Sequence, residues 1–149
     1  MAAAFAALAA PAAASTRGNA GGTFNFIHDT VTPVGKADGY TFLSEVATIS
    51  YTGGLTGIAS ATDTIVVHPD GSINGHGIET CRWCTIGGRT GSFTAVFTFH
   101  GSGGQISGRE MFIGGEAGLA GLHGGGQFQG SPAGNTYSYD YLFTGGAHR

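Results

Sequence analysis

Charged residues are scarce in this chain of 149 residues: Asp, Glu, Lys and Arg together make up 10% of it. Six basic side chains face nine acidic ones, and the net charge of −3 excludes the basic surface that binding to nucleic acid requires. The apolar run at residues 1–15 is too short to cross a membrane as a helix. We therefore expect neither a nucleic-acid partner nor insertion into a membrane.

Catalytic motifs are also missing. The sequence contains neither G-x-S-x-G nor H-E-x-x-H, so serine-hydrolase and zincin chemistry have no support. Gly118, Gly121 and Gly124 invite comparison with a phosphate-binding loop, but they do not lead from a strand into a helix and no Lys-Ser/Thr pair follows them. None of these three kinds of site is expected, and no cofactor is predicted.

The chain is instead rich in glycine, with 29 residues, and in segments of Thr, Val, Phe and Tyr. That combination is typical of short strands joined by glycine turns, and no segment after residue 15 shows a helical period. The sequence predicts one all-β domain over residues 23–149. The expected strands are 23–29, 40–51, 55–68, 72–80, 91–100, 105–113, the latter half of 114–130, and 135–144.

Residues 1–22 are expected to lie outside this domain. MAAAFAALAAPAAAS at residues 1–15 resembles the end of a secretory signal peptide, which predicts a secreted or cell-envelope protein. It lacks a basic start, so a disordered alanine-rich arm on a cytoplasmic protein is the alternative. Residues 16–22 are interpreted as a linker, and residues 32–38, with Pro33 and Gly35, as a loop.

The two cysteines, Cys81 and Cys84, stand three positions apart beside the central hairpin, whose turn is predicted at Gly87-Gly88. In an extended strand their α-carbons would be about 10 Å apart, whereas a disulfide needs less than about 7 Å. A bonded pair therefore requires a turn or bulge. Zinc ligation with His76 is the weaker alternative because no second cysteine pair exists, and a redox role lacks the βαβ context, so we predict a disulfide and no metal.

Eight strands joined mostly by short turns are best stabilised by closing the sheet, because closure removes exposed edges. An eight-stranded antiparallel closed barrel has an interior that its own side chains fill or that holds one small ligand. A function, if there is one, is expected inside the barrel.

Five segments in a fixed order suggest a family: DGS at 70–72, GGRTGSF at 87–93, FTFHG at 97–101, GLAGLHGGGQF at 118–128 and YSYDYLF at 137–143. Over residues 23–143 the chain resembles a family of small bacterial domains of unknown function. That family is related to the allene oxide cyclase-like barrels, a calycin-like group that includes plant dirigent proteins. The resemblance implies an eight-stranded antiparallel barrel, often a homo-oligomer, whose characterised relatives steer cyclisation of apolar molecules in the lumen without a cofactor. It carries no catalytic motif over to particular positions, and the cysteine pair departs from its pattern.

Three acidic residues, Glu45, Glu79 and Glu110, fall in the middle of expected strands, where a carboxylate is costly to bury without a partner. A carboxyl that faces the lumen would have a raised pKa and could act as an acid or base. Each could instead be solvated on the outer face. Glu79 and Glu110 are the predicted catalytic residues.

Aromatic and histidine side chains are the candidate ligand contacts. Tyr137 and Tyr139 alternate along the last strand, and Phe97 and Phe99 do so along the second arm of the hairpin, so either set packs in the core or lines a pocket. His76 and His100 lie on the two arms of the hairpin. The predicted ligand-binding residues are Tyr137, Tyr139, Phe97, Phe99, His76 and His100.

Three hypotheses follow. The protein binds an apolar small molecule in the lumen; or it is a cofactor-free cyclase or isomerase that confines a reactive conformer there and moves a proton with a buried carboxyl; or its core is filled and its role is structural. An open cavity lined by a carboxyl of raised pKa favours the enzyme, an open neutral cavity the binder, and a filled core the structural protein.

Overall fold

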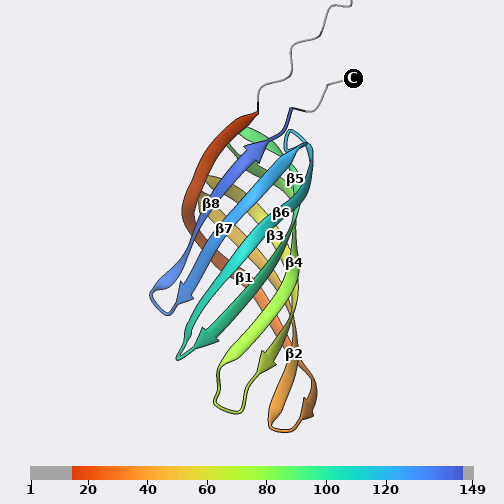
Figure 1. Cartoon of the computed structure of the whole chain (residues 1–149), viewed down its shortest axis with the longest axis vertical. Coiled ribbons are helices and arrows are strands. Elements are labelled where there is room, and N and C mark those ends of the chain that lie inside the picture. Colours follow the sequence, from red (N-terminus) through yellow and green to blue (C-terminus); the bar gives the residue numbers. More distant parts are fainter. Residues whose placement is uncertain (1–14, 146–149) are drawn as a thin grey trace, which may run out of the picture.

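A computed structural model describes residues 15–145 of the chain. Eight antiparallel strands follow one another around a closed ring, each paired with the next and the last paired with the first (Figure 1). The strands are β1 (Thr16–Ala37), β2 (Tyr40–Gly53), β3 (Leu55–Val67), β4 (Ile73–Ile86), β5 (Arg89–Ser102), β6 (Gln105–Ala117), β7 (Leu122–Ser131) and β8 (Gly134–Phe143). The all-β prediction of eight antiparallel strands is confirmed.

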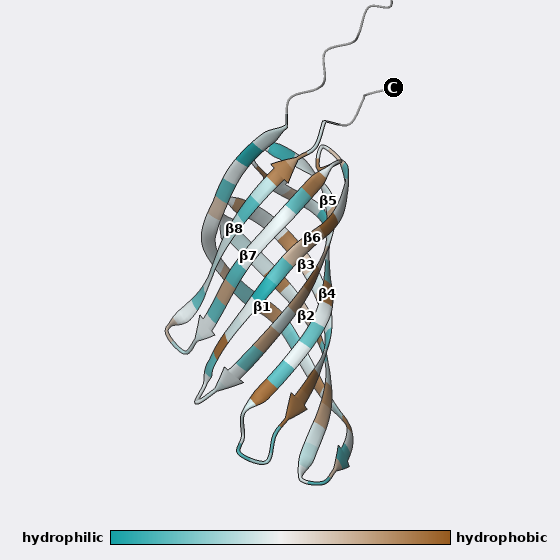
Figure 2. Ribbon diagram, viewed as in Figure 1, coloured by the Kyte–Doolittle hydropathy of each residue, from teal (hydrophilic) through white to brown (hydrophobic). Residues whose placement is uncertain are grey.

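Alternation along the strands separates the inside of the barrel from the outside. In β5, Phe93, Ala95 and Phe97 are buried while the residues between them are partly exposed. Figure 2 shows hydrophilic and hydrophobic residues interchanging along the ribbons in the same way. A period of two is what a sheet with one buried face requires, and closing the sheet turns that face into the core.

Two-residue turns with positive φ join several neighbouring strands. Gly87 and Gly88 have φ of 59° and 73°, as predicted for the central hairpin. Asp38 and Gly39, with φ of 51° and 84°, make the same kind of turn between β1 and β2. Asp-Gly is among the pairs that such hairpin turns prefer, because both central residues need positive φ and glycine adopts it without strain.

Strand β1 is much longer than predicted. The residues interpreted as a linker, 16–22, pair with β8, and those interpreted as a loop, 32–38, pair with β2 up to Ala37. Proline and glycine favoured a loop, but Pro33 and Gly35 flank a register shift, where a residue without an amide proton is tolerated. The sheet therefore begins at Thr16. The signal-like segment at residues 1–14 lies outside the described residues.

The cysteine pair lies within β4 rather than beyond the end of that strand. Cys81 pairs with Phe93 and Cys84 with Gly91, so β4 carries a bulge between the two cysteines. Their sulfur atoms are at disulfide-bonding distance and their α-carbons are 5.9 Å apart. On the neighbouring strand, a Cβ at Gly57 would lie 2.6 Å from Cys84 Sγ, so the bulge needs a glycine opposite it.

One end of the barrel is packed with apolar side chains. Large side chains with at most 1% exposure gather there from the strand ends and from the turn between β6 and β7: Leu55, Ile86, Leu119, Leu122 and Phe143. The hydroxyl of Tyr137 accepts the N–H of Leu55 at 2.8 Å and lies 2.8 Å from the carbonyl oxygen of Thr52 and 2.9 Å from that of Leu55. We call this end the closed end. Strand β1 begins there and β8 ends there (Figure 1).

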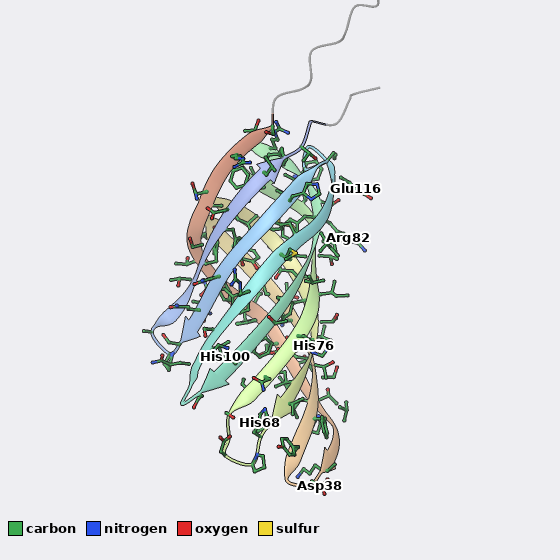
Figure 3. All side chains as sticks on the ribbon, in the orientation of Figure 1. Asp38, His68, His76, Arg82, His100 and Glu116 are labelled. Carbon is green, nitrogen blue, oxygen red and sulfur yellow. A yellow bond between two sulfur atoms is a disulfide. The ribbon has the colours of Figure 1, made fainter. Side chains whose placement is uncertain are left out.

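The opposite end, which carries the turns β1–β2, β3–β4, β5–β6 and β7–β8, is less tightly packed and is called the open end. Figure 3 shows Asp38 and His68 at this end and Glu116 at the closed end. Within residues 15–145, the structure has no helix that is both long and apolar enough to span a membrane.

Replacing Tyr137 with phenylalanine should destabilise the fold. The change leaves the backbone groups of Leu55 at the closed end without a side-chain partner, so we expect the free energy of unfolding to fall by about 2 kcal/mol. Urea denaturation measures it. Tyr40→Phe, at a ring that is 36% exposed, serves as the control and should change it little. Equal stability of the Tyr137 variant and the control would contradict the role of this hydroxyl.

Candidate functional site

A cavity of about 180 Å³ occupies the half of the barrel nearer the open end. Apolar side chains from several strands form most of its wall: Phe24, Phe26, Ala47, Ile49, Ala61, Ile65, Ile73, Phe97, Phe99, Ile106 and Phe128. Some of these lining residues reach solvent, and Phe26 is 47% exposed. The cavity is therefore a pocket with an opening rather than a sealed void.

Small inward residues account for the space. Ala47 on β2 pairs directly with Ala61 on β3, and Ala61 pairs with Glu79 on β4. Glu79 in turn pairs with Ala95 on β5. Three alanines in one row leave room that larger side chains would fill, and the carboxyl of Glu79 occupies the middle of that row. The same pattern explains why an acidic side chain can point into a lumen with mostly apolar walls.

Glu79 and Glu110 are both buried, with exposed fractions of 1% and 5%, and both line the cavity. Each carboxyl accepts one hydrogen bond from a tyrosine: Tyr51 donates to Glu79 Oε2 at 2.9 Å, and Tyr139 donates to Glu110 Oε2 at 3.2 Å. The second oxygen of each carboxyl, Oε1, has no hydrogen-bond partner within the protein. A buried oxygen without a partner is costly, so these two atoms are available to a molecule in the cavity.

Burial controls the ionisation of this pair. Loss of solvation raises the pKa of Glu79 to about 7, against the opposing hydrogen bond from Tyr51. Burial and then repulsion from Glu79 raise the pKa of Glu110 well above its ordinary value. Burial likewise raises the pKa of Tyr139, so its hydroxyl remains a proton donor. Both shifts favour the protonated carboxyl, and Glu79, with a pKa of about 7, is divided between its two forms at neutral pH.

A second acidic group, Asp29, Glu45 and Asp63, lines the same cavity. Glu45 and Asp63 are direct neighbours on β2 and β3. Burial, followed by hydrogen bonds with Asp29 and Asp63, raises the pKa of Glu45 to about 9, and burial raises that of Asp63. Glu45 is therefore protonated at neutral pH, and its carboxyl is hydrogen-bonded to Asp29 and Asp63.

Sequence reasoning missed Asp29 and Asp63. Asp29 was placed at the end of a short strand, because the loop prediction hid the continuation of β1. Asp63 shares a face with Ala61 and Ile65, and this alternation was a usable signal. Its pairing with Glu45 depends on the register of two strands, which the spacing of residues along the chain does not give.

The predicted ligand-binding residues divide into three groups. Tyr139, Phe97 and Phe99 line the cavity, together with both predicted catalytic residues. Tyr137 is buried but contributes to the closed end instead. His76 and His100 are exposed on the outer face and do not line the cavity, so their predicted place in the lumen is wrong.

The alternation of side chains along a strand explains why these two histidines lie on the outer face. His76 stands three positions before Glu79, and His100 three positions after Phe97, so each points to the face opposite that of its neighbour. The ring of His100 instead lies 3.1 Å from the hydroxyl of Ser107 on the next strand. Among the described residues, no group of three or more His, Cys, Asp or Glu side chains has the arrangement of a metal site.

Comparison with known proteins identifies the fold. No family model and no curated protein matches the sequence. A solved structure from Shewanella oneidensis MR-1, described as a protein of unknown function from the DUF3224 family, superposes with a TM-score of 0.73. It is 18% identical, and the alignment covers 88% of this chain and all of that one. At this identity the likeness concerns the fold alone: the chain shares the all-β architecture of a small domain of unknown function.

Glu79 should make the protein less stable as the pH rises. Its pKa is about 7 in the folded protein against 4.5 for an ordinary glutamate. The folded state therefore binds the extra proton between these values, and stability is lost as the pH rises from about 4.5 to about 7. The expected loss is about 3 kcal/mol. Glu79→Gln should remove this part of the pH dependence.

Urea denaturation at a series of pH values measures the effect. Glu116→Gln changes the same chemical group at an exposed position at the closed end, and it should leave the pH dependence as it is. An unfolding free energy of the Glu79 variant that changes with pH as in the unaltered protein would contradict the assignment.

Proposed function

We propose that this protein binds an apolar small molecule inside the barrel, with the carboxyls of Glu79 and Glu110 and the hydroxyl of Tyr139 as polar anchors. One observation carries the proposal: an open cavity with mostly apolar walls contains two buried carboxyl oxygens that have no partner in the protein. Ligand pockets combine apolar walls with a few polar groups that fix orientation.

The size of the cavity limits the ligand. A volume of about 180 Å³ slightly exceeds the engineered cavity of about 150 Å³ that takes up benzene. The cavity therefore has room for a group of about one ring, and a longer ligand would extend through the opening. Space of this size argues against the alternative in which the barrel is filled by its own side chains.

The proposed fold family is that of the allene oxide cyclase-like barrels. Support comes from the resemblance of the sequence motifs and from the closed ring of eight antiparallel strands. Relatives in that group act on apolar molecules in the lumen without a cofactor, which agrees with the position of the cavity.

Filling the cavity should abolish binding. Ala61 is 3% exposed and lines the cavity, so Ala61→Phe would occupy space that the ligand needs. Native mass spectrometry of the protein from its own host, compared with a denatured sample, should show a bound mass in the unaltered protein and none in this variant. Val46→Phe, which adds a ring at a side chain that is 56% exposed, is the matched control. A bound mass retained by the Ala61 variant would contradict a site in the lumen.

A cofactor-free isomerase or cyclase is the second candidate, and the ionisation of Glu79 favours it. A group whose pKa is about 7 can accept a proton from a substrate and return it at neutral pH. Glu110 in its protonated form, which burial favours, would donate a hydrogen bond to a developing negative charge. The apolar wall would hold the substrate in a reactive conformer.

Removing the proton-transfer group separates this candidate from simple binding. The substrate is a compound of the class identified by mass spectrometry in protein from its own host. Glu79→Gln should lower turnover of this compound by about 100-fold or more while the compound still binds. Product formation followed by mass spectrometry, beside binding measured on the same samples, tests it. Unchanged turnover in both Glu79→Gln and Glu110→Gln would exclude these carboxyls as the acid and base.

A further inference from the structure

We propose that the ligand is an organic cation, an apolar body of about one ring that carries an ammonium group, held by the acidic side chains of the cavity. This inference rests on the proposed function, since it assigns a charge to the ligand of the same site. It follows from three features of the cavity: its charge, its unpartnered oxygens and its aromatic wall.

The acidic residues of the chain are concentrated in the cavity. Of nine Asp and Glu residues, those that line it are Asp29, Glu45, Asp63, Glu79 and Glu110. They come from five different strands, β1, β2, β3, β4 and β6. None of the described residues that line the cavity is Lys, Arg or His. When these carboxyls ionise, the cavity carries charge of a single sign, and a cleft of one charge sign with apolar walls concentrates ligands of the opposite sign.

Unpartnered oxygens point to a missing positive group. Oε1 of Glu79 and Oε1 of Glu110 are buried without a hydrogen-bond partner, and so is Oδ1 of Asp63. Two of these atoms belong to the pair Glu79 and Glu110, and the third belongs to the second acidic group of the cavity. Oxygens that lack a hydrogen-bond donor are therefore present in both groups. An ammonium group supplies up to three donors and a charge, whereas a neutral hydroxyl supplies one donor and no charge.

The aromatic wall suits the same ligand. Phe24, Phe97, Phe99 and Phe128 line the cavity beside Tyr51 and Tyr139. Phe24 and Phe97 each meet Phe128 edge to face, with ring centroids 6.3 Å apart. Aromatic faces attract cations, and quaternary ammonium groups are recognised by such surroundings. The rings thus favour both the apolar body and the charge.

The pH dependence of binding should differ between a cationic ligand and a neutral one. In the empty cavity the carboxyls are crowded and poorly solvated, which favours their protonated forms. A bound cation favours the carboxylates instead, so binding releases protons and strengthens as the pH rises. A neutral ligand that accepts a hydrogen bond from a protonated carboxyl weakens with pH. The titratable groups that face the cavity are Asp29, Glu45, Tyr51, Asp63, Glu79, Glu110 and Tyr139, and His76 acts on Asp63 from the outer face.

Titration calorimetry with two probes of similar shape distinguishes these cases. The probes are 2-phenylethylamine and 2-phenylethanol, tested at about pH 6, 7 and 8, where an alkylamine stays charged. We expect the amine to bind at least about tenfold more tightly than the alcohol at pH 7. Its affinity should rise with pH, and titrations in buffers of different ionisation enthalpy should show proton release.

Variants of the half-buried pair Glu45 and Asp63 isolate the effect of charge on binding. The double change Glu45→Gln and Asp63→Asn should weaken amine binding about tenfold and alcohol binding much less, because the alcohol carries no charge for these carboxylates to attract. Glu116→Gln removes a charge from an exposed side chain at the closed end, and it should alter neither amine binding nor alcohol binding. Circular dichroism and urea denaturation verify that each variant is folded.

The outcomes separate the two proposals. If the alcohol binds as tightly as the amine, or if amine affinity falls as the pH rises, the cationic ligand is wrong and the cavity remains a binding site. If neither probe binds at millimolar concentration and the host protein carries no ligand, the proposed function itself is wrong.

Discussion

Strand β1 pairs with β8 from Thr16 opposite Phe143 to Thr23 opposite Thr136, and this pairing closes the sheet. Because the ring is closed, its strands have two backbone neighbours each, and the sheet has no free edge that would pair with another chain. Closure also separates a lumen from solvent. The low solvation that raises the pKa values of Glu79 and Glu110 is a consequence of this one contact between the first and last strands.

The lumen divides into two regions with different tasks. At the closed end, Leu55, Ile86 and Phe143 pack without solvent, and the Tyr137 hydroxyl satisfies backbone groups near the turn. Toward the open end, alanines replace large side chains and carboxyls replace apolar ones. Buried acidic groups and empty space both lower stability, and the packed end offsets that cost. An arrangement of this kind favours a binding role over a purely structural one.

Sequence patterns predicted the strands, because alternation of side chains with a period of two is typical of a sheet with one buried face. They left open whether Glu79 and Glu110 face the lumen, and the structure shows that both are buried there. Sequence patterns predicted less where the structure depends on pairing between distant segments. The length of β1 was missed because Pro33 and Gly35 indicated a loop, while pairing on both sides of the strand tolerates them at an irregular position. The contact of Glu45 with Asp63 depends on register alone. For His76, alternation gives only that it faces opposite to Glu79, and the burial of Glu79 then places it on the outer face.

Both the first residue of β1 and the last residue of β8 lie at the closed end (Figure 1), whereas the cavity lies nearer the other end. The position of these two strand ends determines how the barrel is oriented when it is attached to a surface or to another protein. A tether that starts at Thr16 or Phe143 would leave the barrel at the end opposite the cavity. Attachment at the closed end would therefore orient every copy with its open end toward the solution.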